Sequence, residues 1–549
     1  MAVNLQTGGP ALGPDVLKRI GAAVGAGDYE KASGLAQEEI DRGCVHPVLY
    51  NARAMWLERQ QRDSEALIDY QRSKSLVPNS PLVLIAMGLC HARLFQYQEA
   101  IASFDEAVRL NPLEMSGYNR KAEVLSLIGD FDGAMRSYER AVTLDPRNAE
   151  SLAGLASIWA QKGDAKKAAD YAKRAVLLDP AHATAHAVLA QVDISQRNFS
   201  SAEERIRPFL QDPHIIGKGR ASLFGVLGDA LDGQHRAAEA FEAYTVENPE
   251  LLRRNALRFA GSMKLADLCD ALAAHYKDRS IVTDLDASAD STASSGPQGH
   301  VFLLGFYRSG TTLLEQALEA HPGIVTLEER EILGADAERF LTSHAGRSRL
   351  DALTGSELQA ARNRYWQNVN REGLNVHGKI FVDKHPLNTA KLPLIARLFP
   401  DAKILFAVRD PRDVIFSCFR RHFQINAAMY ELLTLPGAAR LYDAVMRLAV
   451  IVREQPPLKF MDCRYENIVD DFEGSMRAIC EFIGISYDAS MENFSSVVRA
   501  DNIRSPSASQ VKRELYREGV AQWRPYAAQL DVIAPILNRW VDRFGYPAE

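Results

Sequence analysis

Prolines recur at a fixed interval through the first half of this 549-residue chain. Four of them stand 34 residues apart and two more follow at intervals of 33 and 36: Pro78, Pro112, Pro146, Pro180, Pro213 and Pro249. A constant period of this length indicates one small structural unit stacked on copies of itself. Proline stops a helix before the next unit begins. The period therefore predicts an extended array of helical pairs in this half, not a single compact core.

Small residues recur at the same distances before these prolines. Three successive units each have three of them: Gly88, Ala100 and Ala107; Ala122, Ala134 and Ala141; Ala156, Ala168 and Ala175. Small residues are needed where the two antiparallel helices of a unit cross closely. Larger apolar residues such as Leu84, Phe104 and Tyr138 fill the stacking faces between them.

This pattern resembles the tetratricopeptide repeat over residues 14–250. The resemblance implies an N-terminal all-α solenoid, and helical residues 250–281 are expected to cap it, so we predict a solenoid domain over 14–282. Such solenoids usually bind a peptide or protein in their concave groove, although a structural or oligomerising spacer would show the same pattern. The sequence does not identify the partner.

A change of composition separates the two halves. Residues 283–299 are small, polar and acidic, with almost no apolar side chains, which is typical of a mobile linker or an exposed loop. We therefore predict a second domain over residues 300–549.

The second half opens on a strand, a glycine turn and a helix. The apolar run 301–304 is followed by a turn from Gly305 to Gly310 and then by apolar residues at helical spacing. This order aims free backbone N–H groups and the positive end of a helix at a phosphate. Thr311 stands where a nucleotide-triphosphate loop has its lysine, and the cation comes earlier, at Arg308. Nucleotide-triphosphate hydrolysis is therefore disfavoured.

Further strands are expected at 324–327, 379–382, 403–408 and 459–463, with helical stretches between them. This alternation predicts a parallel, doubly wound sheet whose ligands sit beyond the carboxyl ends of the strands. Polar clusters follow several of these strands and include four cations: Arg308, Lys384, Arg409 and Arg412. Such a set suits a ligand with two separate anionic groups.

The ordered motifs resemble those of the sulfotransferases over residues 301–530, most closely the protein-tyrosine branch. They are Arg-Ser-Gly-Thr-Thr from 308, His-Pro at 321, Glu-Glu at 328, Asp-Lys-x-Pro from 383, Arg-Asp-x-Arg from 409 with a serine at 417, and Arg-Tyr-Glu from 464. The resemblance implies a C-terminal α/β, P-loop-like sulfotransferase domain with a parallel sheet. It also implies 3′-phosphoadenosine 5′-phosphosulfate as co-substrate, with no metal expected.

The resemblance assigns roles by position. The residues that would hold the 5′-phosphosulfate are Arg308, Ser309, Gly310, Thr311 and Thr312. Arg409 with Ser417 would hold the 3′-phosphate, and Tyr465 would lie near the nucleotide. Simpler structural interpretations remain, in which Arg409 and Arg412 pair with neighbouring aspartates and Tyr465 only packs.

Two residues compete for the part of catalytic base. Glu329 occupies the position of the tyrosine branch's catalytic glutamate. His385 is the rival, because cytosolic small-molecule sulfotransferases use a histidine shortly after a lysine, but His385 follows Lys384 one residue sooner than in that pattern. Lys384 is expected to sit on the bridging oxygen as charge builds on the leaving phosphate. We favour Glu329. The branch usually has an arginine two residues after this glutamate, and Glu331 in its place argues against a tyrosine acceptor.

Composition narrows the alternatives. The net charge of −6 does not suit a nucleic-acid coat, and neither an 18-residue apolar run nor a signal-peptide pattern is present. Six scattered cysteines favour a reducing compartment, so a cytoplasmic protein is expected. The leading hypothesis is a sulfotransferase acting on a hydroxyl acceptor, including a peptide or protein recruited by the solenoid. The alternatives are sulfation of a carbohydrate or small metabolite, and an inactive nucleotide-binding scaffold whose solenoid mediates protein–protein interaction. A P-loop kinase is disfavoured by the missing lysine.

Overall fold

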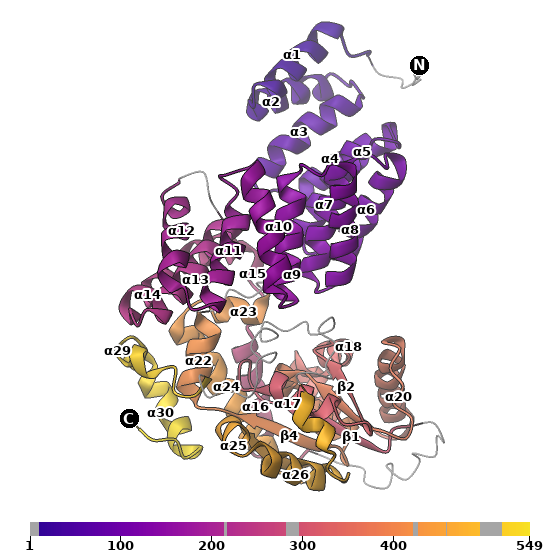
Figure 1. Ribbon diagram of the computed structural model, residues 1–549. Helices are drawn as coiled ribbons and strands as arrows, with labels where there is room; N and C mark the ends of the chain where they lie inside the picture. Colours follow the sequence, from indigo (N-terminus) through magenta and orange to yellow (C-terminus); the bar gives the residue numbers. More distant parts are fainter. Residues whose placement is uncertain are drawn as a thin grey trace. The chain divides into compact units, whose positions relative to one another are not determined.

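The computed structural model describes residues 10–212, 217–281, 296–420, 426–456, 458–494 and 519–548 (Figure 1). The chain divides into two compact units, Met1–Val192 and Asp193–Glu549. Apart from its last four residues, the predicted linker 283–299 lies outside the described part.

The first unit consists of helices that pack as consecutive pairs, as Figure 1 shows. They are α1 (Pro14–Gly25), α2 (Tyr29–Asp41), α3 (Pro47–Arg59), α4 (Asp63–Leu76), α5 (Pro81–Arg93), α6 (Tyr97–Leu110), α7 (Met115–Leu127), α8 (Phe131–Leu144), α9 (Ala149–Gln161), α10 (Ala165–Leu178) and α11 (Ala183–Ser195), which runs past the division. Four of these helices end two residues before the first four prolines of the period, as predicted. Pro213 lies outside the described residues. Pro249 differs, because it stands in the first turn of α15 (Asn248–Phe259) and begins a helix instead of ending one.

The predicted small residues lie at the crossings of the paired helices. The eight alanines among them are fully buried, with an exposed fraction of 0%. At Gly88 an added Cβ would lie 2.5 Å from the ring of Phe104, so only glycine lets α5 approach α6 this closely. The sequence interpretation of these positions is confirmed.

In its described residues, the second unit begins with five more helices and continues into a sheet. The helices are α12 (Phe199–Gln211), α13 (Gly217–Gly233), α14 (Ala237–Thr245), α15 and α16 (Leu265–Tyr276). The strands are β1 (Gly299–Leu304), β2 (Ile324–Glu328), β3 (Ile380–Lys384), β4 (Lys403–Val408) and β5 (Lys459–Arg464). Their order is β2-β3-β1-β4-β5 and all pairs are parallel, as predicted.

Helices cover both faces of this sheet. The helices after β1 are α17 (Thr311–Glu319), α18 (Gly334–Leu341), α19 (His344–Asp351), α20 (Gly355–Arg371), α21 (Leu392–Leu398), α22 (Pro411–Phe419), α23 (Ala427–Glu431), α24 (Leu435–Arg453), α25 (Tyr465–Asp470), α26 (Phe472–Ile483), α29 (Ala527–Leu530) and α30 (Ala534–Arg543). On one face, α17 and α26 bury Leu314 and Ile479 against Leu303 of β1. On the other, the Tyr365 ring of α20 packs against Phe302. Successive side chains of β1 therefore pack into hydrophobic cores on opposite faces of the sheet, as in a doubly wound fold.

The helices that open the second unit pack on its sheet-bearing part. The rings of Phe241 and Tyr244 in α14 lie 5.6 Å from Phe419 and 6.3 Å from Phe416 of α22. Helix α16 packs along α24. The helical character predicted for 250–281 is confirmed in α15 and α16. The division into compact units falls after Val192, whereas the change of composition falls at residues 283–299. The domain limits 14–282 and 300–549 therefore stay predictions.

Candidate active site

The predicted site residues gather at one edge of the sheet. Since all five strands are parallel, the residues that follow them meet at the same edge. The chain leaves β1 toward β3 and β2 on one side and later crosses to β4 and β5 on the other. The topological switch point therefore lies at β1, where open α/β sheets bind their ligands.

The turn between β1 and α17 has the backbone of an anion-binding loop. Gly305, Arg308 and Gly310 have φ angles of 150°, 65° and 98°. Gly310 precedes the first turn of α17, whose leading N–H groups have no partner within the helix. A Cβ at Gly310 would lie 2.8 Å from the Tyr465 ring, so a side chain is excluded there. Arg308, in the left-handed region without being glycine, is a strained residue of the kind concentrated at functional sites.

Hydrogen bonds within the turn and to a buried threonine hold this turn in place. The Ser309 hydroxyl donates to the carbonyl of Phe306 over 2.6 Å. The N–H of Gly305 donates to Oγ1 of Thr389 over 3.0 Å, and Thr389 is fully buried. Thr311 and Thr312 begin α17, are nearly buried, and complete the predicted loop. Thr389 was missed by sequence reasoning, because its contact with the loop spans 84 residues and leaves no local signal.

Arg308 is in direct contact with Ser417. Its Nε donates to the Ser417 hydroxyl over 3.0 Å. Nη1 of Arg409 donates to the carbonyl of Arg308 over 3.0 Å, and its Nη2 donates to the carbonyl of Gly519. The Arg409 guanidinium also lies 4.9 Å from the centre of the Tyr465 ring. The loop and the proposed 3′-phosphate residues are therefore one connected group.

Arg412 does not join this group. Its guanidinium donates to Asp410 over 3.0 and 2.8 Å and to the carbonyls of Pro547 and Ala548 over 2.7 and 2.9 Å. It also lies 3.7 Å from the centre of the Trp523 ring. The simpler interpretation, in which Arg412 pairs with a neighbouring aspartate, is therefore observed, and Arg412 holds the C-terminal segment against α22 instead of joining the predicted group of four cations.

Lys384, at the end of β3, is enclosed by three glutamates. Its Nζ lies 2.9 Å from Oε2 of Glu315, 2.9 Å from Oε1 of Glu329 and 3.6 Å from Oε1 of Glu328. The lysine side chain is fully buried. Burial by itself lowers the pKa of a lysine, but the three carboxylates outweigh it and raise the pKa of Lys384 above its usual value. The ammonium therefore stays charged.

Glu329 is held against this lysine by its backbone as well as its side chain. It has a φ of 43°, and its N–H donates to the carbonyl of Lys384 over 2.7 Å. Burial alone would raise the pKa of Glu329, but the Lys384 ammonium, helped by His385 and Arg308, brings that pKa below its ordinary value. Glu329 is therefore an ionised carboxylate at neutral pH, and its side chain is 30% exposed.

His385 lies beside the same carboxylate cluster. Its Nε2 is 4.0 Å from Oε2 of Glu331, which also pairs with Lys391. Burial lowers the pKa of His385, so the imidazole is neutral at pH 7. Its Nδ1 is buried without a hydrogen-bond partner among the described residues. Glu331, the departure from the branch pattern, thus faces Lys391 and His385.

Glu315 is a site residue that sequence reasoning missed. It lies on α17 with 1% of its side chain exposed, and burial raises its pKa to about 8. The sequence does carry a signal, because Leu314 and Leu318 mark the apolar face of this helix and Glu315 lies between them. A glutamate on a buried helix face needs a partner, and Lys384 provides it.

This arrangement suits an anionic ligand next to a proton acceptor. The fit of a phosphorylated ligand rests on three observations: the positive-φ loop, the excluded side chain at Gly310, and Nε of Arg409, which is buried with no hydrogen-bond partner among the described residues. Loop N–H groups, Arg308 and Arg409 can bind negative charge, while the Glu329 carboxylate can take a proton.

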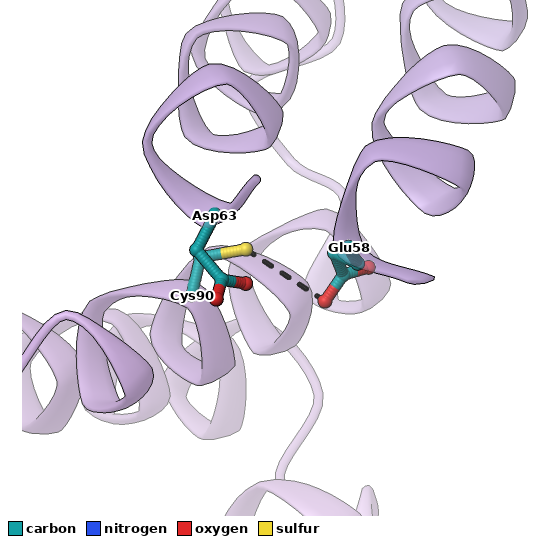
Figure 2. Close-up of side chains that lie close together, drawn as sticks. All are labelled: Glu58, Asp63 and Cys90. Carbon is teal, nitrogen blue, oxygen red and sulfur yellow. Dashed lines mark hydrogen bonds between the residues drawn. The ribbon is translucent and has the colours of Figure 1, made fainter. Parts of the chain in front are cut away.

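A second group of titratable side chains lies in the first unit, where Glu58, Asp63 and Cys90 come together (Figure 2). Arg93 pairs with Glu58 and, over 2.6 Å, with Asp63. Burial raises the pKa of Cys90 to about 12, so its thiol is protonated and a poor metal ligand. The two carboxylates of the group are accounted for by their ion pairs with the partly exposed Arg93, which join successive helices.

A cleft of about 1000 Å³ lies between α16, α24 and α30, away from the sheet edge. Its arginines are mostly ion-paired: Arg447 with Asp270, and Arg543 with Glu454 over 3.7 Å. None of the site residues predicted from the sequence lines this cleft.

Both halves of the chain match models of known protein families. Residues 300–489 match the model described as the sulfotransferase family, and residues 81–113 and 128–186 match tetratricopeptide repeat models. The chain therefore carries N-terminal tetratricopeptide repeats and a C-terminal sulfotransferase domain with a parallel sheet.

Among known proteins, several that are similar to this chain are protein-tyrosine sulfotransferases. Protein-tyrosine sulfotransferase 1 of Danio rerio is 26% identical over 257 residues, covering 44% of this chain and 71% of that protein. Protein-tyrosine sulfotransferase A of Caenorhabditis elegans is 25% identical over 257 residues, covering 44% and 66%. Protein-tyrosine sulfotransferase 1 of Homo sapiens is 32% identical over 152 residues, covering 26% and 40%.

Solved structures similar to this chain include tetratricopeptide repeat proteins. One from Parabacteroides merdae is 13% identical with a TM-score of 0.36, covering 42% of this chain and 90% of its own. MamA from Desulfovibrio magneticus is 25% identical with a TM-score of 0.27, covering 30% and 93%. Among the described residues, none of the helices is both long enough and apolar enough to cross a membrane.

Proposed function

We propose that the sulfotransferase domain transfers a sulfuryl group from 3′-phosphoadenosine 5′-phosphosulfate to a hydroxyl acceptor, and that the solenoid recruits a peptide or protein bearing it. One observation carries the proposal. The anion-binding loop after β1 and the Lys384–Glu329 pair after β3 and β2 stand on the same edge of the sheet. A binding loop alone would suit a scaffold, but a buried lysine joined to a partly exposed carboxylate adds the groups that transfer chemistry needs.

Donor binding is assigned to the connected group. Arg308 and the loop through Thr312 take the 5′-phosphosulfate, while Arg409 and Ser417 take the 3′-phosphate beside Tyr465. Because Arg308 donates to Ser417 over 3.0 Å, binding exchanges this hydrogen bond for bonds to the donor.

Transfer needs one bond formed and one broken. The acceptor oxygen attacks sulfur, the bond from sulfur to the bridging oxygen breaks, and its electron pair stays on the phosphate. Lys384 neutralises that developing charge. Glu329 takes the acceptor proton, which its ionised carboxylate permits. His385, neutral at pH 7, is the rival acceptor of this proton.

Calorimetry with the product 3′-phosphoadenosine 5′-phosphate tests the proposal. We expect this bisphosphate to bind more tightly than ATP, and R308A to lose the binding. No binding to the unmodified protein, or tighter binding of ATP, would overturn the proposed donor.

The acceptor and the location complete the proposal. The solenoid groove favours a peptide or protein acceptor over a carbohydrate or small metabolite, since repeat arrays offer extended binding surfaces. All six cysteines are unpaired and buried, which supports a cytoplasmic, reducing location.

A further inference from the structure

Lys384 has no surface of its own from which to reach a donor. Its side chain is fully buried, and its ammonium is shared between Glu315 and Glu329 at 2.9 Å each. A lysine that is to neutralise a leaving phosphate has to exchange at least one of these partners for the phosphate.

The two partners differ in what they can do afterwards. Glu329 is 30% exposed, so water or an acceptor can replace the lysine. Glu315 is 1% exposed on α17, and neither of its oxygens has a hydrogen-bond partner among the described residues apart from this ion pair. Once its cation is withdrawn, an ionised Glu315 would be an isolated buried charge, which is prohibitively costly, so it must take up a proton.

We propose that Glu315 is a positioning residue of the sulfotransferase site: with Glu329 it holds the Lys384 ammonium until the donor binds, and where it is ionised it takes up a proton when the phosphate draws the ammonium away. This inference rests on the proposed function. Withdrawal of the ammonium also makes Glu329 a stronger base. Glu329 loses the cation that lowers its pKa at the moment when it must take the acceptor proton.

The charged groups around the pair set the pH at which this is visible. Glu315 faces Lys384 from α17, and Glu328 and Glu329 face it from the end of β2. His385, which directly follows β3, and Arg308, in the loop after β1, also act on Glu329. With a pKa of about 8, Glu315 is largely ionised at pH 8.5, and withdrawal of Lys384 raises that pKa further. Binding at pH 8.5 therefore takes a fraction of a proton from the buffer.

The experiment is calorimetry of 3′-phosphoadenosine 5′-phosphate binding at pH 8.5 in buffers of different ionisation enthalpy, which counts the protons exchanged. The phosphates are fully ionised at this pH, since their second pKa is about 6, so they contribute little to the count. We expect net uptake of a fraction of a proton by the unmodified protein and its loss in E315Q. The matched control is E338Q, at an exposed carboxylate on α18, which keeps the uptake.

Three outcomes separate the two proposals. Binding with uptake that E315Q abolishes supports the inference. Binding with the same uptake in E315Q overturns the inference and leaves the proposed function standing. Absence of binding to the unmodified protein overturns the proposed function, and the inference falls with it. If the substitution disrupts the fold, E315Q loses binding. If Glu315 only stabilises the fold, a variant that still binds shows the same proton count as the unmodified protein.

Discussion

Adding one methyl group at Gly310 tests the anion-binding loop directly. The residue has a φ of 98° and caps α17, and an added Cβ would lie 2.8 Å from Cδ2 of Tyr465. A non-glycine residue in left-handed conformation costs about 1–2 kcal/mol. The overlap with the ring adds about 1–3 kcal/mol of overpacking unless the loop shifts.

The structure offers a control for the first of these costs. Gly373 has a φ of 76° with nothing within 4 Å of an added Cβ, so G373A measures conformational strain without a clash. G310A should lower the stability of the second unit by about 1–3 kcal/mol more than G373A does. It should also weaken binding of 3′-phosphoadenosine 5′-phosphate at least about tenfold, which corresponds to about 1.4 kcal/mol, whereas G373A should bind normally.

The assays are thermal unfolding and calorimetry, with Y465A as a second-site variant. Because the predicted clash is with the Tyr465 ring, G310A combined with Y465A should regain the part of the stability that the clash removes. G310A with unchanged stability and unchanged affinity would refute the loop geometry. A double variant no better than G310A alone would refute the role of the ring.

Three further changes have defined outcomes. E329Q should keep donor-product affinity within about twofold and lower turnover at least about a hundredfold, since general bases contribute about 10²–10⁴-fold; full turnover in E329Q with loss in H385A would move the base to His385. G88A should lower the unfolding temperature of the first unit through its clash with Phe104, at a cost of about 1–3 kcal/mol, while G34A, where nothing lies within 4 Å, should not. Burial raises the pKa of Asp383 to about 7, above the 3.8 of the unfolded chain, so its contribution to stability is present below pH 4 and is lost as the pH rises through 7. The unfolding temperature should therefore fall between pH 4 and 7 more in the unmodified protein than in D383N; parallel pH curves would contradict this.

The sequence predicts the regular parts well, because their signals are local. Strand β4 agrees with its expected limits, and the other strands differ by one or two residues at their ends. The loop after β1 is also local, since glycines at 305 and 310 mark two of its three positions with positive φ, the third being Arg308.

Contacts between distant residues explain what the sequence does not predict. Arg412 was misplaced because the carbonyls that hold it come from Pro547 and Ala548, far along the chain. The direct bond between Arg308 and Ser417 spans 109 residues, so no spacing suggests it. Glu315 differs, since a glutamate on an apolar helix face does signal a buried partner, but the sequence does not say that the partner is Lys384.

The segment between the predicted domains is a further case in which contacts between distant residues could not be predicted. Composition changes sharply near residue 290, yet rings of α14 pack on α22 within the second unit. Small polar residues between two segments show that a linker is present, but they carry no information on how the flanking helices pack. The rings at 241 and 244 supply that information only once their neighbours are known.

Transfer of a labelled sulfuryl group tests the central claim most directly. The unmodified protein is incubated with 3′-phosphoadenosine 5′-phosphosulfate labelled at sulfur and a lysate of its source cells, in parallel with E329Q and R308A. We expect covalently bound label to appear in a macromolecular or small acceptor with the unmodified protein and to fall to background with both variants. Label at background with the unmodified protein, or equal label with E329Q and R308A, would contradict a sulfotransferase site built on these residues.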